Sequence, residues 1–247
     1  LSDEESTITI PVKSDYDYTV DMPAWITGEK VKEGYNFTLT ENTTGNARKG
    51  TVIFKSQKGT KEITFVQFGV NDIAGTYEAT YSTFGEGDDW VSETVKIELL
   101  QDEENEAVFY ADGLSSIRGV VLPLKFDGET YQLSALNGQY LGFIESQKWY
   151  LYTIVRSEAG YVHADTSLSY PAIAELDVDD EELMPFFPFK DKKGFSFTGE
   201  TGTIKSFIDA IGVYVFASKS PTFGNNNNLG YYDIFKDLSI KKIKADH

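Results

Sequence analysis

Short segments in which apolar and polar side chains alternate with a period of two recur along most of this chain. In Thr7–Val12, Tyr16–Val20 and Tyr35–Thr40, every second side chain is apolar or aromatic. A period of two is that of a β-strand with one buried face, because successive side chains of a strand point to opposite faces. Turns rich in Gly, Asp and Asn separate many of these segments. The sequence therefore predicts an all-β protein built from antiparallel sheets.

Acidic residues outnumber basic ones, and this imbalance limits the partners of the chain. The 247 residues include 39 Asp and Glu against 22 Lys and Arg, a formal net charge of −17. Polyanions are bound chiefly by neutralising their charge with Lys and Arg. We therefore expect no nucleic-acid partner and no binding to an anionic membrane surface.

The chain contains no Cys, which removes disulfides, thiol nucleophiles, zinc–thiolate sites and iron–sulfur clusters as options. No apolar run approaches the roughly 20 residues that span a bilayer. The first five residues, Leu1–Glu5, lack the basic and apolar regions of a secretory leader. We expect either a cytosolic protein or one from which a leader has been removed.

Charge is distributed unevenly, and this predicts two domains. Residues 1–70 carry a net charge of −2, so −15 of the total −17 falls on the remainder. The change occurs near Gly69–Asp72. The length suits two modest domains, since one domain typically takes about 100–200 residues. We predict a sandwich over residues 1–70 and a larger domain over residues 72–247.

The first 70 residues resemble the Bacteroidetes-associated carbohydrate-binding often N-terminal (BACON) domain. The resemblance rests on Ala24–Ile26, Asn42–Thr44, Arg48–Phe54 and Ile63–Gly69, which occur in the order of that family. It implies an immunoglobulin-like β-sandwich. A strand position that is often Trp in the family is Tyr18 or its neighbour Tyr16 here.

Three residues of this part have physical roles that can be predicted without the family. Trp25 stands beside Ile26 at a strand end and is expected to pack into the core rather than to stack on a ligand. Arg48 is expected to cover a sheet edge. Gly50 is expected to serve turn geometry.

The second part begins with consecutive strands joined by tight turns, which predicts an antiparallel meander. These segments are Gly75–Tyr81, Val91–Leu100, Ala107–Tyr110, Gly119–Phe126, Thr130–Leu133, Gln139–Phe143 and Trp149–Val155. A long meander tends to close on itself, because closure removes exposed strand edges. This part resembles the calycin or lipocalin-like barrels of surface lipoproteins in gut Bacteroidetes, on the residues Gly75-x-Tyr77, Gly113-Leu114 and Gly138–Gly142.

The last third is less regular. Ile204, Phe207, Ile208 and Ile211 have helical spacing, which predicts a short helix packed on or plugging the sheet. The acidic segment Leu176–Pro185 is either a short helix or a loop. Ser220–Gly230 has the composition of a loop. Leu238–Ile243 is predicted to be a closing strand whose basic residues face outwards.

No motif predicts catalysis or cofactor binding. His163 is the one internal His, and no Gly-x-Ser-x-Gly sequence surrounds any Ser. We interpret His163 as a strand-edge residue. Paired carboxylates can hydrolyse glycosides, but the abundance of Asp and Glu alone is no evidence for such a pair. We therefore predict no catalytic residue, no cofactor and no enzymatic activity.

Five acidic residues between positions 177 and 182 are candidate calcium ligands, because hard cations bind clustered carboxylates. The segment lacks the glycine and the terminal Glu of an EF-hand loop. A solvated acidic loop is the favoured interpretation, and we predict no metal site.

Aromatic residues in loops are the best candidates for a ligand site. Sugars bind in water by stacking their C–H faces on aromatic rings, while carboxylates and amides bond the hydroxyl groups. Trp90 follows Gly85–Asp89, and Tyr231 and Tyr232 follow an Asn run. Trp149 begins an aromatic strand. These four residues are the predicted site, with core packing an equal alternative for Trp90 and Tyr232 and the favoured one for Trp149.

Taken together, the two resemblances imply a non-catalytic, glycan-binding accessory lipoprotein of a polysaccharide-uptake system. Such a protein lies at the cell surface or in the periplasm and is attached to the outer membrane only through a lipid anchor, here expected on a Cys that was removed together with the leader upstream of Leu1. One alternative is a protein-interaction module with the sandwich as a spacer. Another is a lipocalin-like carrier of a small apolar ligand. The sequence does not indicate an oligomeric state.

Overall fold

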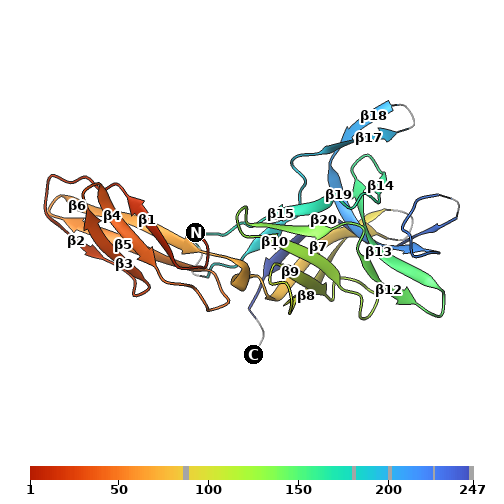
Figure 1. The fold of residues 1–247 in the computed structure, drawn as a ribbon, viewed down its shortest axis with the longest axis horizontal. Helices are drawn as coiled ribbons and strands as arrows, with labels where there is room; N and C mark the ends of the chain where they lie inside the picture. The colour runs from red at the N-terminus through yellow and green to blue at the C-terminus, as the bar shows by residue number, and fades with distance from the viewer. Residues whose placement is uncertain (86–88, 180–181, 200–201, 225, 245–247) are drawn as a thin grey trace. The chain divides into compact units, whose positions relative to one another are not determined.

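The computed structural model describes residues 1–85, 89–179, 182–199, 202–224 and 226–244, and the chain divides into two compact units. The first unit comprises Leu1–Ile73 and Leu176–Met184; the second comprises Ala74–Glu175 and Pro185–His247 (Figure 1). The described residues form β-strands and a short 3₁₀ turn, η1 (Val70–Asp72), without any α-helix. The all-β prediction is confirmed.

The first unit is a sandwich of two antiparallel sheets. One sheet has the order β1-β4-β3 and the other the order β2-β5-β6. The strands are β1 (Ser6–Ile10), β2 (Tyr18–Asp21), β3 (Ile26–Val31), β4 (Gly34–Leu39), β5 (Arg48–Ser56) and β6 (Gly59–Gln67). The core between the sheets consists of Ile26, Phe37, Leu39, Val52, Phe54 and Phe65. Strands β5 and β6 form a hairpin with its turn at Ser56–Gly59.

The segment Leu176–Met184 groups with this first unit, although the sequence analysis placed it with the second domain. Within the unit, the Lys49 ammonium donates a hydrogen bond of 2.8 Å to the carbonyl oxygen of Val178. The described residues of the segment have no helical turn. For the described residues of this segment, the loop alternative is therefore confirmed over the helix.

The second unit begins with the predicted meander. Its strands β7 (Gly75–Phe84), β8 (Trp90–Gln101), β9 (Val108–Asp112), β10 (Leu122–Asp127) and β11 (Gln132–Leu136) are sequential neighbours in one antiparallel sheet. Beyond them, β15 (Ser169–Ile173) pairs with β11. The predicted continuation of the meander is wrong after β11, because β12 (Tyr140–Ile144) and β13 (Trp149–Ser157) join the opposite end of the sheet.

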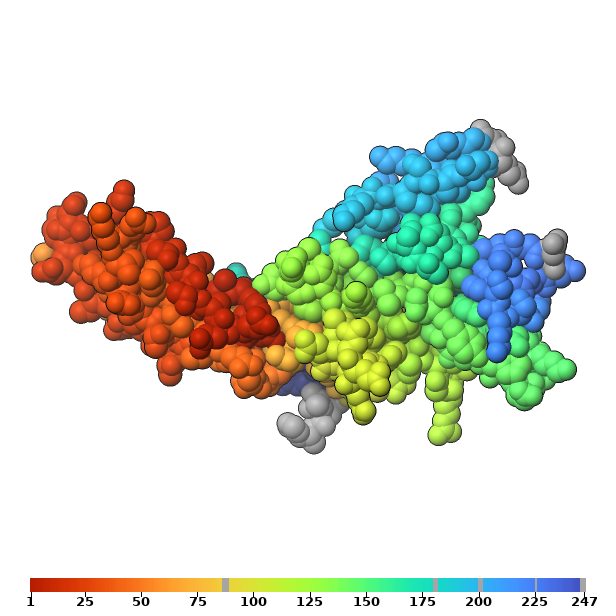
Figure 2. Space-filling view, in the orientation of Figure 1, coloured from red at the N-terminus to blue at the C-terminus, as the bar shows by residue number. Residues whose placement is uncertain are grey.

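The opposite end of the sheet is organised by β20 (Asn228–Lys242), which pairs with β7 along one edge. On the other edge, the first part of β20 pairs with β19 (Ile208–Phe216), and the last part pairs with β16 (Phe186–Pro188). From β19 the sheet continues to β13 and β12. Two smaller elements complete the unit: β14 (Val162–His163), which pairs with β13, and the hairpin of β17 (Phe195–Gly199) and β18 (Gly202–Ser206). Figure 2 shows this hairpin, in light blue, standing out from the body of the second unit.

Residues around β16 join β15, the strand at one end of the sheet, to β20. Phe189 donates a backbone hydrogen bond to Leu238 in β20, and Lys190 donates one to Pro171 in β15. Side chains that share one face through the strand pairings fill the enclosed space. These fully buried residues include Tyr77, Ile97, Leu99, Phe109, Leu122, Tyr170 and Phe187.

Three predictions for the last third are corrected. The predicted helix over Ile204–Ile211 is wrong, because Ile204 belongs to β18, Ile208 and Ile211 belong to β19, and Phe207 lies between the two strands. The closing strand begins at Asn228, so it takes in the end of the predicted loop Ser220–Gly230. The basic residues of this strand do not all face outwards: Lys241 is exposed, whereas Lys242 is buried at 6% exposure.

Trp25 packs against the core of the first unit, as predicted. The Arg48 guanidinium lies 4.4 Å from the centre of the Trp25 ring and donates hydrogen bonds to Gln67 and to the backbone of Thr40. Gly50 does not lie in a turn but inside β5, where a Cβ atom would come within 2.6 Å of the Trp25 ring. The prediction for Gly50 is therefore wrong: this glycine makes room for the Trp25 ring.

We predict that Gly50→Ala destabilises the first unit by about 1–3 kcal/mol, because an added methyl group in a packed position forces its neighbours to shift. Hydrogen exchange of the β5 and β6 amides measures this loss. In a Trp25→Val background the same substitution should cost less, since the ring is gone and only the contact of the added methyl group with Pro23 Cγ, at 2.8 Å, remains. An equal cost in both backgrounds would show that the ring is not the reason for the glycine.

Candidate functional site

An exposed aromatic group of the second unit lies where β7 ends and β8 begins. Phe84 and Trp90 are cross-strand partners there, and their rings stack with centres 4.0 Å apart and planes inclined by 30°. Trp90 remains 36% exposed. The sequence analysis placed Trp90 in a loop, whereas it is the first residue of a strand. Strand pairing therefore holds this ring in a defined position at the surface.

Tyr231 of β20 joins this pair. Its ring centre lies 5.5 Å from that of Phe84 and 6.0 Å from that of Tyr214 in β19. Tyr231 is 44% exposed, while Tyr214 is buried. The structure thus brings together two of the four predicted site residues, Trp90 and Tyr231.

The same face of the sheet carries further aromatic residues from neighbouring strands. Tyr214 is the register partner of both Tyr231 and Tyr152, and Tyr152 is in turn the partner of Tyr140. Tyr152 and Tyr214 are buried, whereas Tyr140 is 54% exposed. We call this set the aromatic row; its members in sheet order are Tyr140, Tyr152, Tyr214, Tyr231, Phe84 and Trp90.

Charged side chains surround the exposed Trp90 ring. The Arg156 guanidinium lies 5.4 Å and the Lys236 ammonium 5.5 Å from its centre. Asp209 accepts two hydrogen bonds from Nη1 of Arg156, at 3.1 and 2.9 Å through its two oxygens. Lys236 is itself ion-paired with Asp237. We call Trp90, Tyr231, Arg156, Asp209 and Lys236 the Trp90 site.

A β-bulge supplies Asp209 to the site. Arg156 pairs with Ala210 and Ser157 pairs with Ile208, so Asp209 has no residue opposite it on β13. Bulges re-aim a side chain and are frequent beside functional sites. Sequence reasoning missed Arg156, Asp209 and Lys236, because they come from three strands far apart in the chain and Asp209 fell in a segment predicted to be helical.

The surroundings of the site shift two protonation equilibria. Burial raises the pKa of the Asp209 carboxyl above its usual value, and the Arg156 guanidinium offsets part of this effect. Burial also raises the pKa of Tyr214 to about 12. The Tyr214 hydroxyl therefore stays protonated at neutral pH and can donate a hydrogen bond.

The other two predicted site residues lie apart from this group. Tyr232 is 48% exposed and occupies a bulge of β20, between the paired residues Tyr231 and Asp233. Trp149 is half-buried. In β13 it lies one residue before Tyr150 and three residues before Tyr152, and strand residues an odd number of positions apart point to opposite faces. Because Tyr152 belongs to the aromatic row, Trp149 points to the other face of the sheet.

His163 lies beside a serine, but this serine is not accessible. Its Nε2 atom is 3.2 Å from the Oγ atom of Ser157, which is fully buried. Rings of Phe195 and Phe197 from the β17–β18 hairpin pack against the imidazole, with centres 4.8 and 4.6 Å away. Burial lowers the pKa of His163. This arrangement is that of a packed structural residue at a strand edge.

The described residues offer no cluster of three or more His, Asp or Glu that could hold a metal ion. In the acidic segment, Asp177 caps a turn by accepting a hydrogen bond of 3.0 Å from the backbone N–H of Asp179. Two of its candidate calcium ligands, Asp180 and Glu181, lie outside the described residues. No helix in the described part of the chain is long and apolar enough to cross a membrane.

Comparisons of the chain with protein-family models, curated proteins and solved structures found no match.

We predict that Asp209 titrates above the ordinary Asp value of 3.8 and that this titration changes the fluorescence of Trp90, since protonation weakens the ion pair of the neighbouring Arg156. A pH titration of tryptophan emission should show this step in the native chain and not in Asp209→Asn.

The effect on stability has a defined sign. Because the folded-state pKa lies above the unfolded-state value, this carboxyl contributes stability that is full below the unfolded-state pKa and is lost as pH rises through the folded-state pKa. The free energy of unfolding of the native chain, relative to that of Asp209→Asn, should therefore fall over this range. A difference that rises instead would contradict the assignment.

Proposed function

We propose that this protein binds a glycan, without catalysis, at the Trp90 site. The observation that carries the proposal is a partly exposed Trp90 ring held beside Tyr231 and surrounded by fixed donors and acceptors. Apolar C–H faces of a sugar ring stack on aromatic rings, and its hydroxyl groups need hydrogen-bond partners of both kinds. Trp90 and Tyr231 supply the stacking surface. Arg156, Asp209 and Lys236 supply the hydrogen-bond donors and acceptors.

The charge balance of the site favours a neutral ligand surface rich in hydroxyl groups. Arg156 is balanced by Asp209, and Lys236 is balanced by Asp237. Each pair keeps further lone pairs or N–H groups that a hydroxyl can bond. Because the Arg156–Asp209 pair is largely buried, its geometry is fixed before a ligand arrives, which reduces the entropy lost on binding.

The same pairing argues against hydrolysis at this site. Glycoside hydrolysis needs one carboxylic acid to protonate the leaving group and a second carboxylate to act as base or nucleophile. Asp209 and Asp237 are both engaged by a cation. We therefore propose a binding role rather than an enzymatic one.

The packing of the curled sheet bears on the lipocalin-like alternative. A carrier of a small apolar ligand needs space inside its barrel. Here Tyr77, Phe109, Tyr170 and Phe187 are fully buried in the enclosed space, and the rings of Tyr77 and Phe187 lie with centres 6.4 Å apart. Large side chains thus occupy the region in which a carrier would hold its ligand.

The cellular role remains part of this proposal. The resemblance of residues 1–70 to the BACON domain, and of the second part to calycin or lipocalin-like barrels, supports a glycan-binding accessory lipoprotein at the cell surface or in the periplasm. The two-sheet sandwich and the curled antiparallel sheet agree with the architecture that these resemblances imply.

A glycan array on the intact protein tests the function, followed by titration calorimetry with any glycan that binds. We expect Trp90→Ala to weaken binding at least about tenfold, equivalent to ~1.4 kcal/mol, because it removes the stacking surface. Tyr231→Ala should weaken it less.

Trp149→Phe is the matched control, since this residue faces away from the Trp90 site and should leave binding unchanged. Circular dichroism confirms that each variant is folded. A blank array, or full binding by Trp90→Ala, would rule out the Trp90 site as a glycan site.

A further inference from the structure

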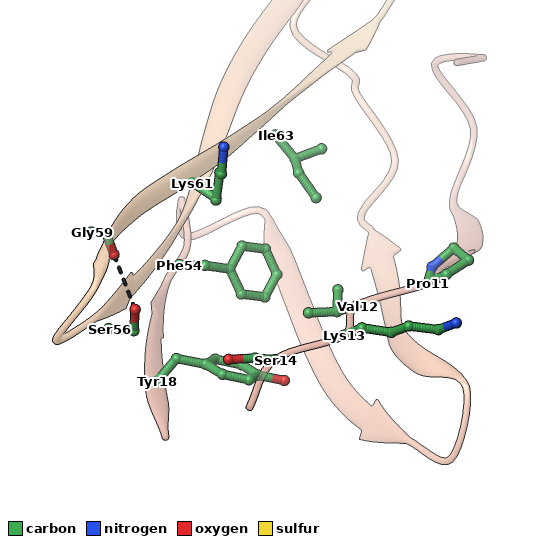
Figure 3. A pocket seen from close by; sticks show the side chains of 10 residues that line it. All are labelled: Pro11, Val12, Lys13, Ser14, Tyr18, Phe54, Ser56, Gly59, Lys61 and Ile63. Carbon is green, nitrogen blue, oxygen red and sulfur yellow. Dashed lines mark hydrogen bonds between the residues drawn. The ribbon is translucent and has the colours of Figure 1, made fainter. Parts of the chain in front are cut away.

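The first unit has a pocket of its own at one end of the sandwich (Figure 3). It lies where the β5–β6 turn and the connection from β1 to β2 meet. Its volume is about 270 Å³, just below the range of about 300–1,000 Å³ that is usual for small-molecule sites. The lining residues are Pro11, Val12, Lys13, Ser14, Tyr18, Phe54, Ser56, Gly59, Lys61 and Ile63.

The floor of this pocket is the apolar end of the sandwich core. The rings of Tyr18 and Phe54 meet edge to face with centres 5.7 Å apart. Val12 and Ile63, both half-buried, pack against the same core. Figure 3 shows Phe54 between Tyr18 and Ile63, so aromatic and branched side chains surround the space together. A flat or branched apolar group would therefore be desolvated there.

Only some polar side-chain groups of the pocket remain available to a ligand. Ser14 Oγ donates to the Tyr16 carbonyl oxygen at 2.8 Å, and Ser56 Oγ donates to the Gly59 carbonyl oxygen at 3.3 Å. Both hydroxyls are thus engaged with the backbone. The side-chain groups left for a ligand are the two ammonium groups of Lys13 and Lys61 and the phenolic hydroxyl of Tyr18.

These two lysines are uncompensated. Both are exposed, and within the described residues neither forms an ion pair. The lining residues include no carboxylate and no carboxamide. In a chain of net charge −17, two lysines that line one apolar pocket and form no ion pair with a described residue make this pocket locally positive.

We propose that this pocket binds a small amphipathic anion, with an aromatic or branched apolar body against Tyr18, Phe54 and Ile63 and a carboxylate or sulfonate between Lys13 and Lys61. A neutral sugar fits this lining poorly, because its hydroxyl groups need carboxylate or amide acceptors as well as donors. A neutral apolar molecule would gain nothing from the lysines. This site is independent of the Trp90 site, and either can exist without the other.

Benzoate and benzyl alcohol are suitable probes, because they share a ring and differ in charge. Backbone amide shifts in NMR spectra of the full chain locate and quantify their binding at low ionic strength, where charge effects are least screened. We expect benzoate to shift amides of residues 12–18 and 59–63 and to bind at least threefold more tightly than the alcohol. Each exposed ion pair is worth roughly 1.4- to 5-fold in affinity.

The Lys13→Gln/Lys61→Gln variant keeps the pocket floor and should reduce benzoate binding to the level of the alcohol. The matched control, Lys32→Gln/Lys205→Gln, removes the same charge from two exposed lysines that do not line the pocket, and should bind benzoate as the native chain does. The proposal would be overturned if benzoate and benzyl alcohol bound with equal affinity, or if the Lys13→Gln/Lys61→Gln variant bound benzoate as the native chain does. An equal loss of benzoate binding in the control, or amide shifts confined to other residues, would also overturn it.

Discussion

The second unit depends on the way one long strand, β20, is shared between different partners. Along one edge it pairs with β7; along the other it pairs first with β19 and then with β16. The last part of β20 thereby belongs to the curled part of the sheet, around Tyr77 and Phe187. The first part of the same strand belongs to the part of the sheet that carries the aromatic row. One strand therefore fixes the packed core and the proposed ligand site relative to each other.

Interruptions in the strand pairing place the chemistry of the Trp90 site. An extra residue at Asp209 allows its carboxylate to meet Arg156. A second irregularity lies between Lys236 and Ser239, where Asp237 adopts a positive φ of 51° and pairs with Lys236. Regular strands would display alternating side chains only, whereas these bulges add charged groups to a face otherwise made of aromatic rings.

Period-two alternation was sufficient to predict the all-β class, the sandwich and the strands β7 to β11, because these strands have one buried and one exposed face. It failed at the start of β19, where Ile208, Ala210 and Ile211 are all buried, so that both faces of the strand carry buried residues. The alternation disappears in such a strand, and the spacing of Ile204, Phe207, Ile208 and Ile211 was mistaken for a helix.

The candidate site was predicted only in part, for a related reason. Trp90 and Tyr231 were found because exposed aromatic residues are recognisable from composition and context. Arg156 and Asp209 were not, because their pairing depends on a bulge that no local pattern records. Gly50 was misread likewise: the need for a glycine comes from the Trp25 ring of another segment.

The sharing of β20 also has a consequence for biosynthesis. Every strand that pairs with β20 precedes it in the chain. Lys242 of β20 pairs with Tyr77, which lies near the beginning of the second unit in the sequence. During translation, the edges of β7, β16 and β19 that pair with β20 stay unpaired until β20 has emerged from the ribosome. The nascent unit therefore has unpaired strand edges for most of its translation, and such edges can pair with other chains.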